Sequence, residues 1–378
     1  MARLGDVCNI INGYAFRSEQ YVDEGIRIIR IANVQKGYIE DSSPVFYSYD
    51  SKDAQKYTLE ENDILMSLTG NVGRVAKLSK EFLPAALNQR VACLRIKDGV
   101  KLDKAFLFNL LNSDYFEQQC IAASKGVAQK NMSTEWLKEY EIPMLTIEQQ
   151  TAIANILNNV SEQILLRKQQ LAKLDELVKS RFVELFEGCE NKVLIGDVIS
   201  ISRGASPRPI SAYITDREDG VNWIKIGDVS ENSLYITKTE EKITPEGAKK
   251  SRMVHKGDFI LSNSMSFGRP YILEINGCVH DGWLIMSDFK ETFNELYLYY
   301  AIRSDDVQYQ FSGKVNGATV KNLNSDLVKN TLIKVPPMER QEQFAAFVEQ
   351  TDKSKLSIQQ SIDQLETLKK SLMQKYFG

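Results

Sequence analysis

The sequence predicts an α+β fold in which two similar mixed α/β domains are joined by two long helices that pair as an antiparallel coiled coil with pseudo-two-fold symmetry. Three observations support this prediction. The chain repeats itself after about 190 residues. Each repeat opens with short β-rich runs separated by turn residues, and it closes with a long heptad-patterned segment whose interior contains no glycine or proline.

Four pairs of segments carry the repeat, and they occur in the same order in both halves of the chain. The pairs are LGDVCNIINGYAF (4–16) with IGDVISISRGASP (195–207), IRIIRIANV (26–34) with VNWIKIGDV (221–229), NDILMSLTGNVGRV (62–75) with GDFILSNSMSFGRP (257–270), and GVAQKNMSTEWL (126–137) with GATVKNLNSDLV (317–328). Matched blocks in a fixed order indicate a duplicated unit. We expect globular domains at 1–143 and 189–336, and helical spacers at 144–188 and 337–378.

The globular part of each repeat mixes strands with helices. In the first copy, RIIRIANVQKG and DILMSLTGNVG are β-branched runs that end in turn residues. A helical stretch, DKAFLFNLLNSDYFEQQC, follows them. This order of elements predicts one α+β domain per repeat.

Prolines mark the start of each long helix. Pro143 in the first copy, and Pro336 with Pro337 in the second, stand just before a glutamine-rich segment. Apolar residues then recur at heptad spacing. The first series is Ile153, Leu157, Val160, Ile164, Leu171, Leu174, Val178 and Leu185, interrupted by Arg167 and Arg181; the second is Phe344, Val348, Thr351, Ile358, Ile362, Leu365, Leu372 and Tyr376, interrupted by Lys355 and Lys369.

The order globule, helix, globule, helix makes any pairing of the two helices antiparallel, because the first helix leads away from the first globule and the second leads back. The alternative is two independent helices, each packed on its own globule. Additional apolar positions widen each stripe beyond what a single neighbour covers, which favours the pairing. These positions are Ile156, Leu177, Phe182, Phe347, Leu368 and Met373.

Composition is that of an ordinary globular chain. Hydrophobic residues make up 43% and charged residues 26%. No apolar run reaches the roughly 20 residues of a membrane helix, and no secretory signal opens the chain, so we expect a cytoplasmic protein without a membrane partner. The five cysteines are scattered and form no Cys-x-x-Cys, which predicts neither disulfides nor a metal site. The net charge of −3 leaves room for local basic patches.

The chain resembles the specificity subunits of type I restriction-modification systems over its whole length. The resemblance lies in the LGDV and IGDV openings, the GNVGR and SFGRP loops, the QKNMS and VKNLN segments, and the spacer starts IEQQTAIANIL and ERQEQFAAFV. It implies two target-recognition domains that read a bipartite double-stranded DNA sequence. It also implies a chain that holds two methyltransferase subunits and, in the full complex, restriction and translocase subunits. Met265 stands where the first copy has Gly70, and the two sets of loops differ widely.

The sequence lacks the signatures of an enzyme. No Gly-x-x-x-x-Gly-Lys-Ser/Thr and no Asn-Pro-Pro-aromatic motif occurs, and His255 and His280 belong to no metal-spaced cluster. The segment LTGNVG lacks the glycine spacing and the long following helix of a nucleotide-binding loop. We therefore predict no catalytic residue, metal or cofactor, with methylation and DNA cleavage carried out by the other subunits.

The duplicated loop is the leading candidate for contact with DNA. In the first copy it offers Ser67, Thr69 and Arg74, and in the second Ser262, Asn263, Ser264 and Arg269. Hydroxyls, open backbone N–H groups and a guanidinium at a turn suit phosphate and base-edge contacts. The same pattern also fits a plain hairpin whose glycines take positive φ and whose arginine is solvated.

Further candidates are basic and amide residues near the matched segments. Asn131 and Asn322, which follow Lys130 and Lys321, are suited to read adenine or to cap a turn. The other candidates for phosphate or base contacts, some of which also fit a role as surface charges, are Arg17, Arg27, Arg30, Gln89 and Arg90 in the first domain and Arg203, Arg208, Lys225, His280 and Lys314 in the second.

A second hypothesis is an adaptor that presents two ligand-binding globules on a coiled-coil bar without contacting DNA. A salt titration separates the two hypotheses, because binding that neutralises several phosphates weakens steeply with salt. The sequence does not specify the bases read, the spacer length, the oligomeric state of the isolated chain, or whether the host has a restriction subunit, because base choice depends on side-chain placement in divergent loops.

Overall fold

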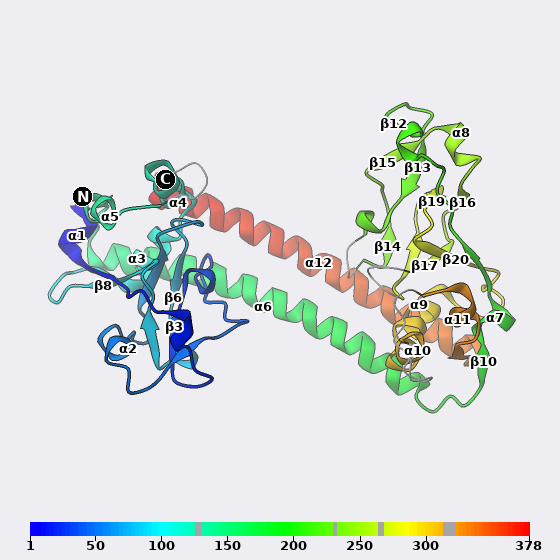
Figure 1. The fold of residues 1–378 in the computed structure, drawn as a ribbon, viewed down its shortest axis with the longest axis horizontal. Coiled ribbons are helices and arrows are strands. Elements are labelled where there is room, and N and C mark those ends of the chain that lie inside the picture. The colour runs from blue at the N-terminus through cyan, green and yellow to red at the C-terminus, as the bar shows by residue number, and fades with distance from the viewer. Residues whose placement is uncertain (125–130, 230–232, 264–267, 313–322) are drawn as a thin grey trace. The chain divides into compact units, whose positions relative to one another are not determined.

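The computed structural model of the 378-residue chain describes residues 1–124, 131–229, 233–263, 268–312 and 323–378. Contacts divide the chain into two units, Met1–Lys168 with Gln359–Gly378, and Gln169–Ile358. Each unit contains one globular domain and parts of both long helices (Figure 1). Within the described part of the chain, no helix is long and apolar enough to cross a membrane.

The first unit is built on two small sheets and a strand pair. A four-stranded sheet has the order β2-β8-β5-β6, a three-stranded sheet has the order β4-β3-β7, and β1 pairs with β9. Its strands are β1 (Ala2–Arg3), β2 (Cys8–Asn12), β3 (Ile26–Ile29), β4 (Phe46–Tyr47), β5 (Ile64–Ser67), β6 (Val75–Lys77), β7 (Ala85–Leu87), β8 (Val91–Ile96) and β9 (Glu141–Ile142). All residues of β5 are buried, as expected for a central strand.

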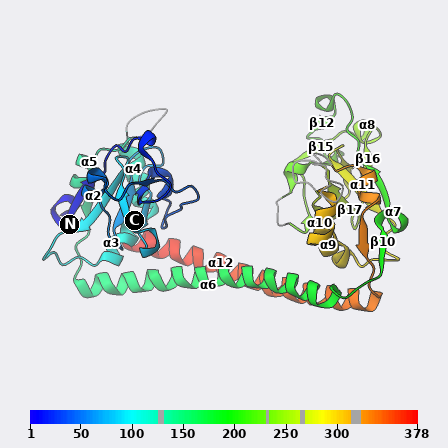
Figure 2. The same ribbon diagram turned by 60° about the horizontal axis from the view of Figure 1, so that its bottom comes forward.

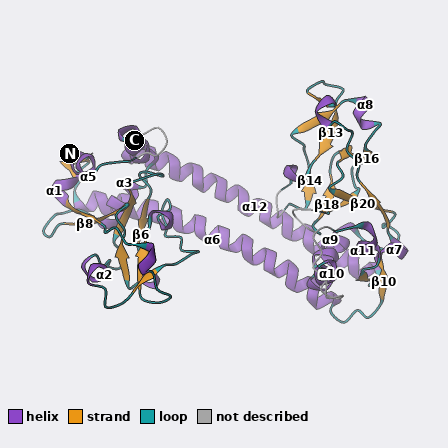
Figure 3. Cartoon of the chain, viewed as in Figure 1, coloured by secondary structure: helices purple, strands orange, loops and turns teal. Residues whose placement is uncertain are grey.

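The second unit repeats this plan, but each of its two main sheets has five strands. One has the order β11-β20-β17-β18-β14, another β12-β15-β13-β19-β16, and β10 pairs with β21. The strands are β10 (Lys192–Leu194), β11 (Ser200–Arg203), β12 (Ile214–Thr215), β13 (Val221–Ile224), β14 (Tyr235–Ile236), β15 (Glu241–Ile243), β16 (Arg252–Val254), β17 (Phe259–Ser262), β18 (Pro270–Leu273), β19 (Gly277–Val279), β20 (Trp283–Ser287) and β21 (Leu332–Lys334). Figure 3 shows strands and helices mixed in both units.

The two sheets that carry the duplicated loop have the same register. Ser67 at the end of β5 faces Val91 at the start of β8, and Ser262 at the end of β17 faces Trp283 at the start of β20. Both strands run antiparallel to the strand that follows the loop, β6 or β18. The duplication inferred from the sequence is therefore present in the hydrogen-bonded framework.

Short helices surround the sheets, and several begin at side-chain caps. The Asp103 and Asn294 side chains accept hydrogen bonds from backbone N–H groups at the starts of α3 and α9. The helices are α1 (Leu4–Val7), α2 (Lys52–Lys56), α3 (Lys104–Leu111), α4 (Asp114–Ala123) and α5 (Thr134–Glu139) in the first domain, and α7 (Ile195–Val198), α8 (Pro245–Ala248), α9 (Glu295–Arg303), α10 (Asp305–Phe311) and α11 (Ser325–Lys329) in the second.

The long helices are α6 (Ile147–Phe186) and α12 (Met338–Phe377). In the first unit, the start of α6 and the end of α12 lie beside the globular domain (Figure 2). Both helices share one hydrophobic core with the domain, through Leu157 and Phe377 among others. In the second unit the roles are exchanged, and Phe186 near the end of α6 contacts Phe344 near the start of α12. Each unit thus pairs the helices antiparallel, and the α+β class with two similar domains and two long paired helices is confirmed.

The seam residue Lys355 and the nearby Lys168 take partners from the other helix, whereas the seam residue Arg181 pairs with Glu184 of its own helix at 2.7 Å. Lys355 contacts Asp175 at 2.7 Å in the second unit, and Lys168 contacts Glu366 at 2.9 Å in the first. Burial lowers the pKa of Lys369, the other lysine at the seam of α12. The long stem of Lys355 therefore fills the seam while its ammonium group reaches a carboxylate.

A buried glutamine joins each long helix to its domain. The Gln150 amide nitrogen of α6 donates to the Lys101 and Leu145 carbonyls, and its oxygen accepts from the Asp103 N–H. Gln341 of α12 makes the matching set to Thr292, Pro336 and Asn294. Both side chains are fully buried with these polar groups satisfied, so the glutamine-rich helix starts seen in the sequence have a structural purpose.

Candidate nucleic-acid interface

The duplicated loop is closed by the same hydrogen bonds in both domains. The Arg74 backbone N–H donates to Ser67 Oγ at 3.1 Å, and the Arg269 N–H donates to Ser262 Oγ at 3.0 Å. Each serine N–H in turn donates to the arginine carbonyl at 2.9 Å. Ser67 and Ser262 are 0% exposed. Their hydroxyls lie inside the loop, so direct contact with DNA would first require the loop to open.

The loop glycines hold each loop against a helix. Gly73 has φ of +84°, and a Cβ there would lie 2.8 Å from Cys120 Cβ of α4. Gly268 has φ of +67°, and a Cβ there would lie 2.9 Å from Phe311 of α10. Positive φ and this close approach both select glycine. The loops are therefore fixed to the framework on one side.

The arginine after each glycine is half-buried. Arg74 Nη1 donates to Gln35 Oε1 at 2.5 Å, which ties the loop to the segment that follows β3. Arg269 occupies the matching place in the second domain, and its backbone closes the loop as Arg74 does. Each arginine therefore follows directly on the backbone bonds that close its loop, and guanidinium groups are suited to phosphate and base contacts.

Three segments of the first domain meet at the end of β5. The Leu68 N–H donates to the Arg90 carbonyl at 3.0 Å, and Thr69 bridges Asn131. Arg90, Gln89 and Asn131 are exposed. The structure therefore brings together five sequence-predicted residues, Thr69, Arg74, Gln89, Arg90 and Asn131, around the end of this strand. Arg17, also exposed, follows Tyr14, whose carbonyl accepts from the Gln89 N–H at 2.8 Å.

Two other predicted residues of the first domain have partners inside the domain. Arg27 pairs with Asp41 and lies over the rings of Phe46 and Phe82 at 5.1 and 5.6 Å. Arg30 Nη2 donates to the Ser43 carbonyl at 2.7 Å. Lys225, the counterpart of Arg30 in the second domain, pairs with Glu241 at 2.8 Å. All three side chains thus have partners within their own domains, although Arg30 Nε is buried without a hydrogen-bond partner among the residues that the structure describes.

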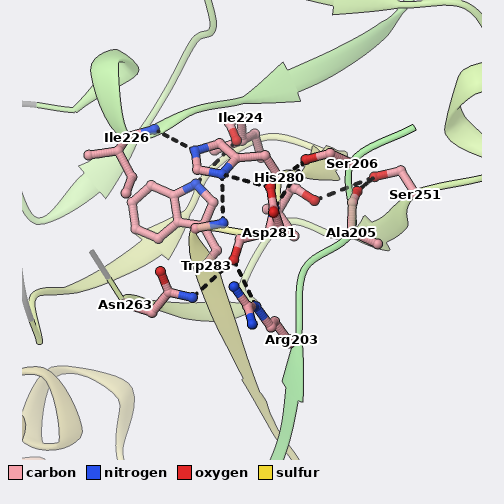
Figure 4. Close-up of polar contacts among 12 residues, drawn as sticks. Arg203, Ala205, Ser206, Ile224, Ile226, Ser251, Asn263, His280, Asp281 and Trp283 are labelled. Atoms are coloured by element: carbon pink, nitrogen blue, oxygen red, sulfur yellow. Dashed lines mark hydrogen bonds and ion pairs between the residues drawn. The ribbon is translucent and has the colours of Figure 1, made fainter. Parts of the chain in front are cut away.

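The second domain places a different group at the matching edge. The turn His280–Asp281–Gly282 joins β19 to β20, and the Asn263 N–H donates to the Gly282 carbonyl at 3.0 Å, as Leu68 does to Arg90. The carbonyl of Asp281 accepts from Arg203 Nε at 3.0 Å and from Asn263 Nδ2 at 2.9 Å (Figure 4). Its carboxylate accepts from Ser206 at 2.7 Å and from Arg208 at 3.3 Å.

His280 lies inside this turn. The Ile226 N–H points at Nε2 at 3.1 Å, and the Gly282 N–H points at Nδ1 at 2.7 Å. A neutral imidazole has one acceptor nitrogen, so it accepts one of these bonds at a time, and a protonated ring would accept neither. Burial lowers the pKa of His280, which agrees with a neutral ring. The position of the ring between the Ile226 and Gly282 N–H groups indicates that His280 supports the shape of the turn.

Five predicted residues lie outside the described residues: Lys130, Ser264, Lys314, Lys321 and Asn322. Sequence reasoning missed Asp281, Ser206 and Gln35. The available signal for Asp281 was its place in the repeat, because it precedes β20 as Gln89 precedes β8. Among the residues that the structure describes, no group of three or more His, Cys, Asp or Glu side chains is arranged to hold a metal ion.

Comparison with known proteins defines the class. The type I restriction modification DNA specificity domain matches residues 1–176 and 190–367, so it covers both repeats. The chain belongs to this family, and it is a specificity subunit with two target-recognition domains. It is 22% identical to the Escherichia coli type I restriction enzyme EcoBI specificity subunit over 99% of this chain and 84% of that protein. It is 24% identical to the putative MjaX specificity subunit of Methanocaldococcus jannaschii over 98% of this chain and 90% of that protein.

Solved structures share the fold. The S subunit of a type I restriction-modification system from M. genitalium superposes with a TM-score of 0.56 at 17% identity, covering 100% of this chain and 95% of the other. A chain from a structure of the complex assembly and conformational transition of a type I restriction-modification system gives 0.63 at 17% identity, covering 100% and 96%. Together these matches support the two-domain, two-helix architecture.

Proposed function

We propose that the chain reads a bipartite DNA target, with one half-site read by each recognition domain. The observation that carries this proposal is the repeated edge. The loops after β5 and β17 are closed by the same serine and arginine bonds, while the exposed side chains around them differ. A constant frame with variable polar groups suits two different base sequences read in the same way.

The long helices are the proposed docking surface for two methyltransferase subunits, and through them for restriction subunits. Apolar side chains on both helices remain exposed although the seam is filled. Leu356 is 62% exposed and Leu165 is 57% exposed, with Ile156, Leu177 and Leu368 also exposed. Apolar side chains that the helix pairing leaves exposed are available for burial against a partner. One such surface in each unit fits two copies of one partner.

Specificity subunits are the non-catalytic members of type I systems, so methylation should depend on this chain without being performed by it. The test is to sequence the methylated bases of the host genome with and without the chain. We expect one bipartite motif to lose its methylation when the chain is deleted and to regain it when the chain is restored. A methylome that does not change on deletion would contradict the proposal, as would methyl transfer by the purified chain alone.

The adaptor hypothesis makes a different prediction for binding. The purified complex of this chain with its methyltransferase should bind a duplex carrying the motif with an affinity that falls steeply between about 50 and 200 mM salt, because bound phosphates release counterions. Salt-independent affinity would favour the adaptor. No contact among the described residues points to a peptide or sugar ligand in preference to DNA.

A further inference from the structure

The turn before β20 places an acidic side chain at an edge where the first domain has an amide. Asp281 and Gln89 each precede the residue whose carbonyl accepts from the loop after the central strand. Both side chains therefore stand at one register position of the repeated frame. A carboxylate at a surface that meets phosphates weakens binding by repulsion unless it accepts a hydrogen bond from the bound molecule.

The turn is held largely by contacts that do not involve this carboxylate. Arg203 and Asn263 bond to the main-chain carbonyl of Asp281 and not to its side chain. The His280 ring meets the N–H groups of Ile226 and Gly282. Figure 4 shows these contacts around the turn, together with the contact between Ser206 and Asp281. The Asp281 carboxylate therefore keeps acceptor capacity beyond its contacts with Ser206 and Arg208.

The carboxylate is nevertheless well oriented. Ser206 Oγ donates to Oδ1 at 2.7 Å and accepts from the Asp281 N–H at 3.3 Å, which fixes the side-chain direction. The Arg208 contact is longer, and the Arg208 side chain is 80% exposed, whereas Asp281 is 44% exposed. An ionised carboxylate has about four acceptor positions, and these two contacts leave some unused. The hydrogen bond from Ser206 lowers the pKa of Asp281, which keeps the group ionised at neutral pH.

We propose that Asp281 is a specificity-determining residue of the second domain that accepts a hydrogen bond from the exocyclic amino group of a cytosine in the major groove. Carboxylates are suited to this contact, because cytosine N4 is a donor in that groove. In the complex, the exposed Arg208 side chain beside Asp281 contacts a phosphate, and this contact offsets the repulsion between the carboxylate and the DNA backbone. Gln89 then provides an amide at the matching position of the first domain, and an amide pairs with adenine N6 and N7. This inference rests on the proposed reading of DNA.

The test replaces the wild-type chain in the host by its Asp281→Asn variant and maps the methylated motif. We expect one position of one half-site to lose its cytosine preference and gain adenine, because an asparagine amide pairs with adenine. The other half-site keeps its sequence. In binding assays, the purified complex of variant and methyltransferase should lose about tenfold or more in affinity for a duplex with the wild-type motif. These assays use duplexes with each of the four bases at every half-site position.

The control is Asp219→Asn, which removes the same charge and an arginine contact in the same domain. Asp219 pairs with Arg217 at 2.6 Å and precedes β13, at the opposite end of that strand from Ile226. It should leave the motif unchanged. An Asp281→Asn motif identical to the wild-type one, or a loss of affinity that is equal for all four bases at every position, would overturn the inference. If deletion of the wild-type chain leaves the methylome unchanged, the proposed function itself fails, and the inference falls with it.

Discussion

The turns before β8 and β20 hold the same place in the two recognition domains, but their chemistry differs. The first is Asn88–Gln89–Arg90, with an exposed amide and an exposed cation. The second is His280–Asp281–Gly282. Here the Asp281 carbonyl accepts hydrogen bonds from Arg203 and Asn263, and its carboxylate accepts from Ser206 and Arg208. The hydrogen bonds that link each turn to its neighbouring loop are the same. The comparison shows that main-chain bonds link the turn to the loop in the same way in both domains, which frees the exposed side chains to diverge.

The largest expected effect comes from breaking the shared frame. Gly73→Ala and Gly268→Ala should each destabilise the protein by about 2–4 kcal/mol, because a positive φ and a clash with α4 or α10 add together. Gly99→Ala and Gly257→Ala are the controls. Both have positive φ, without a close neighbour at Gly99 and with only an ordinary contact at Gly257, and should cost about 1 kcal/mol. Denaturant unfolding measures all four. Equal costs at all four positions would show that the packing of the loop is not what fixes it.

The next effect separates the two half-sites. Arg74→Ala should weaken binding at one half-site and Arg269→Ala at the other, each by about 1–3 kcal/mol if the arginine reads guanine. If the arginine touches only phosphate, affinity should fall evenly across sequences with a shallower salt slope. Binding of the purified complex to half-site variants distinguishes the two cases. Unchanged binding in both variants would show that these two arginines do not contact DNA.

The smallest effect concerns the buried hydroxyls. Ser67→Ala and Ser262→Ala should each cost about 1 kcal/mol of stability, since each removes a hydrogen bond that closes the loop. The methylated motif should stay the same, because neither hydroxyl is exposed. A changed base preference in either variant would show that the loop opens on DNA and that these serines read bases.

Much of the framework was predictable from the sequence, because repetition and periodicity are properties of the chain itself. The offset between the Gly73–Arg74 and Gly268–Arg269 segments predicted two equivalent loops, and heptad spacing predicted two long helices. The direction of single side chains was not predictable. Whether Ser67 points into its loop depends on strand register, and whether Arg27 is available depends on Asp41 and Phe46, which lie elsewhere in the chain. The boundaries 1–143, 144–188, 189–336 and 337–378 stay a prediction.

Gln150 and Gln341 give each recognition domain a stiff attachment to the helix that follows it. Each amide bonds to the start of its own helix and to the segment that leads into α3 or α9. A swivel of the domain about that helix would break the two hydrogen bonds between the glutamine side chain and the domain, to Lys101 and Asp103 or to Thr292 and Asn294, each expensive to leave unmade. A rotation of either helix near its start is therefore coupled directly to a rotation of its domain. A partner that twisted α6 or α12 near its start would therefore turn the domain attached there, together with the exposed residues at the end of β5 or β17.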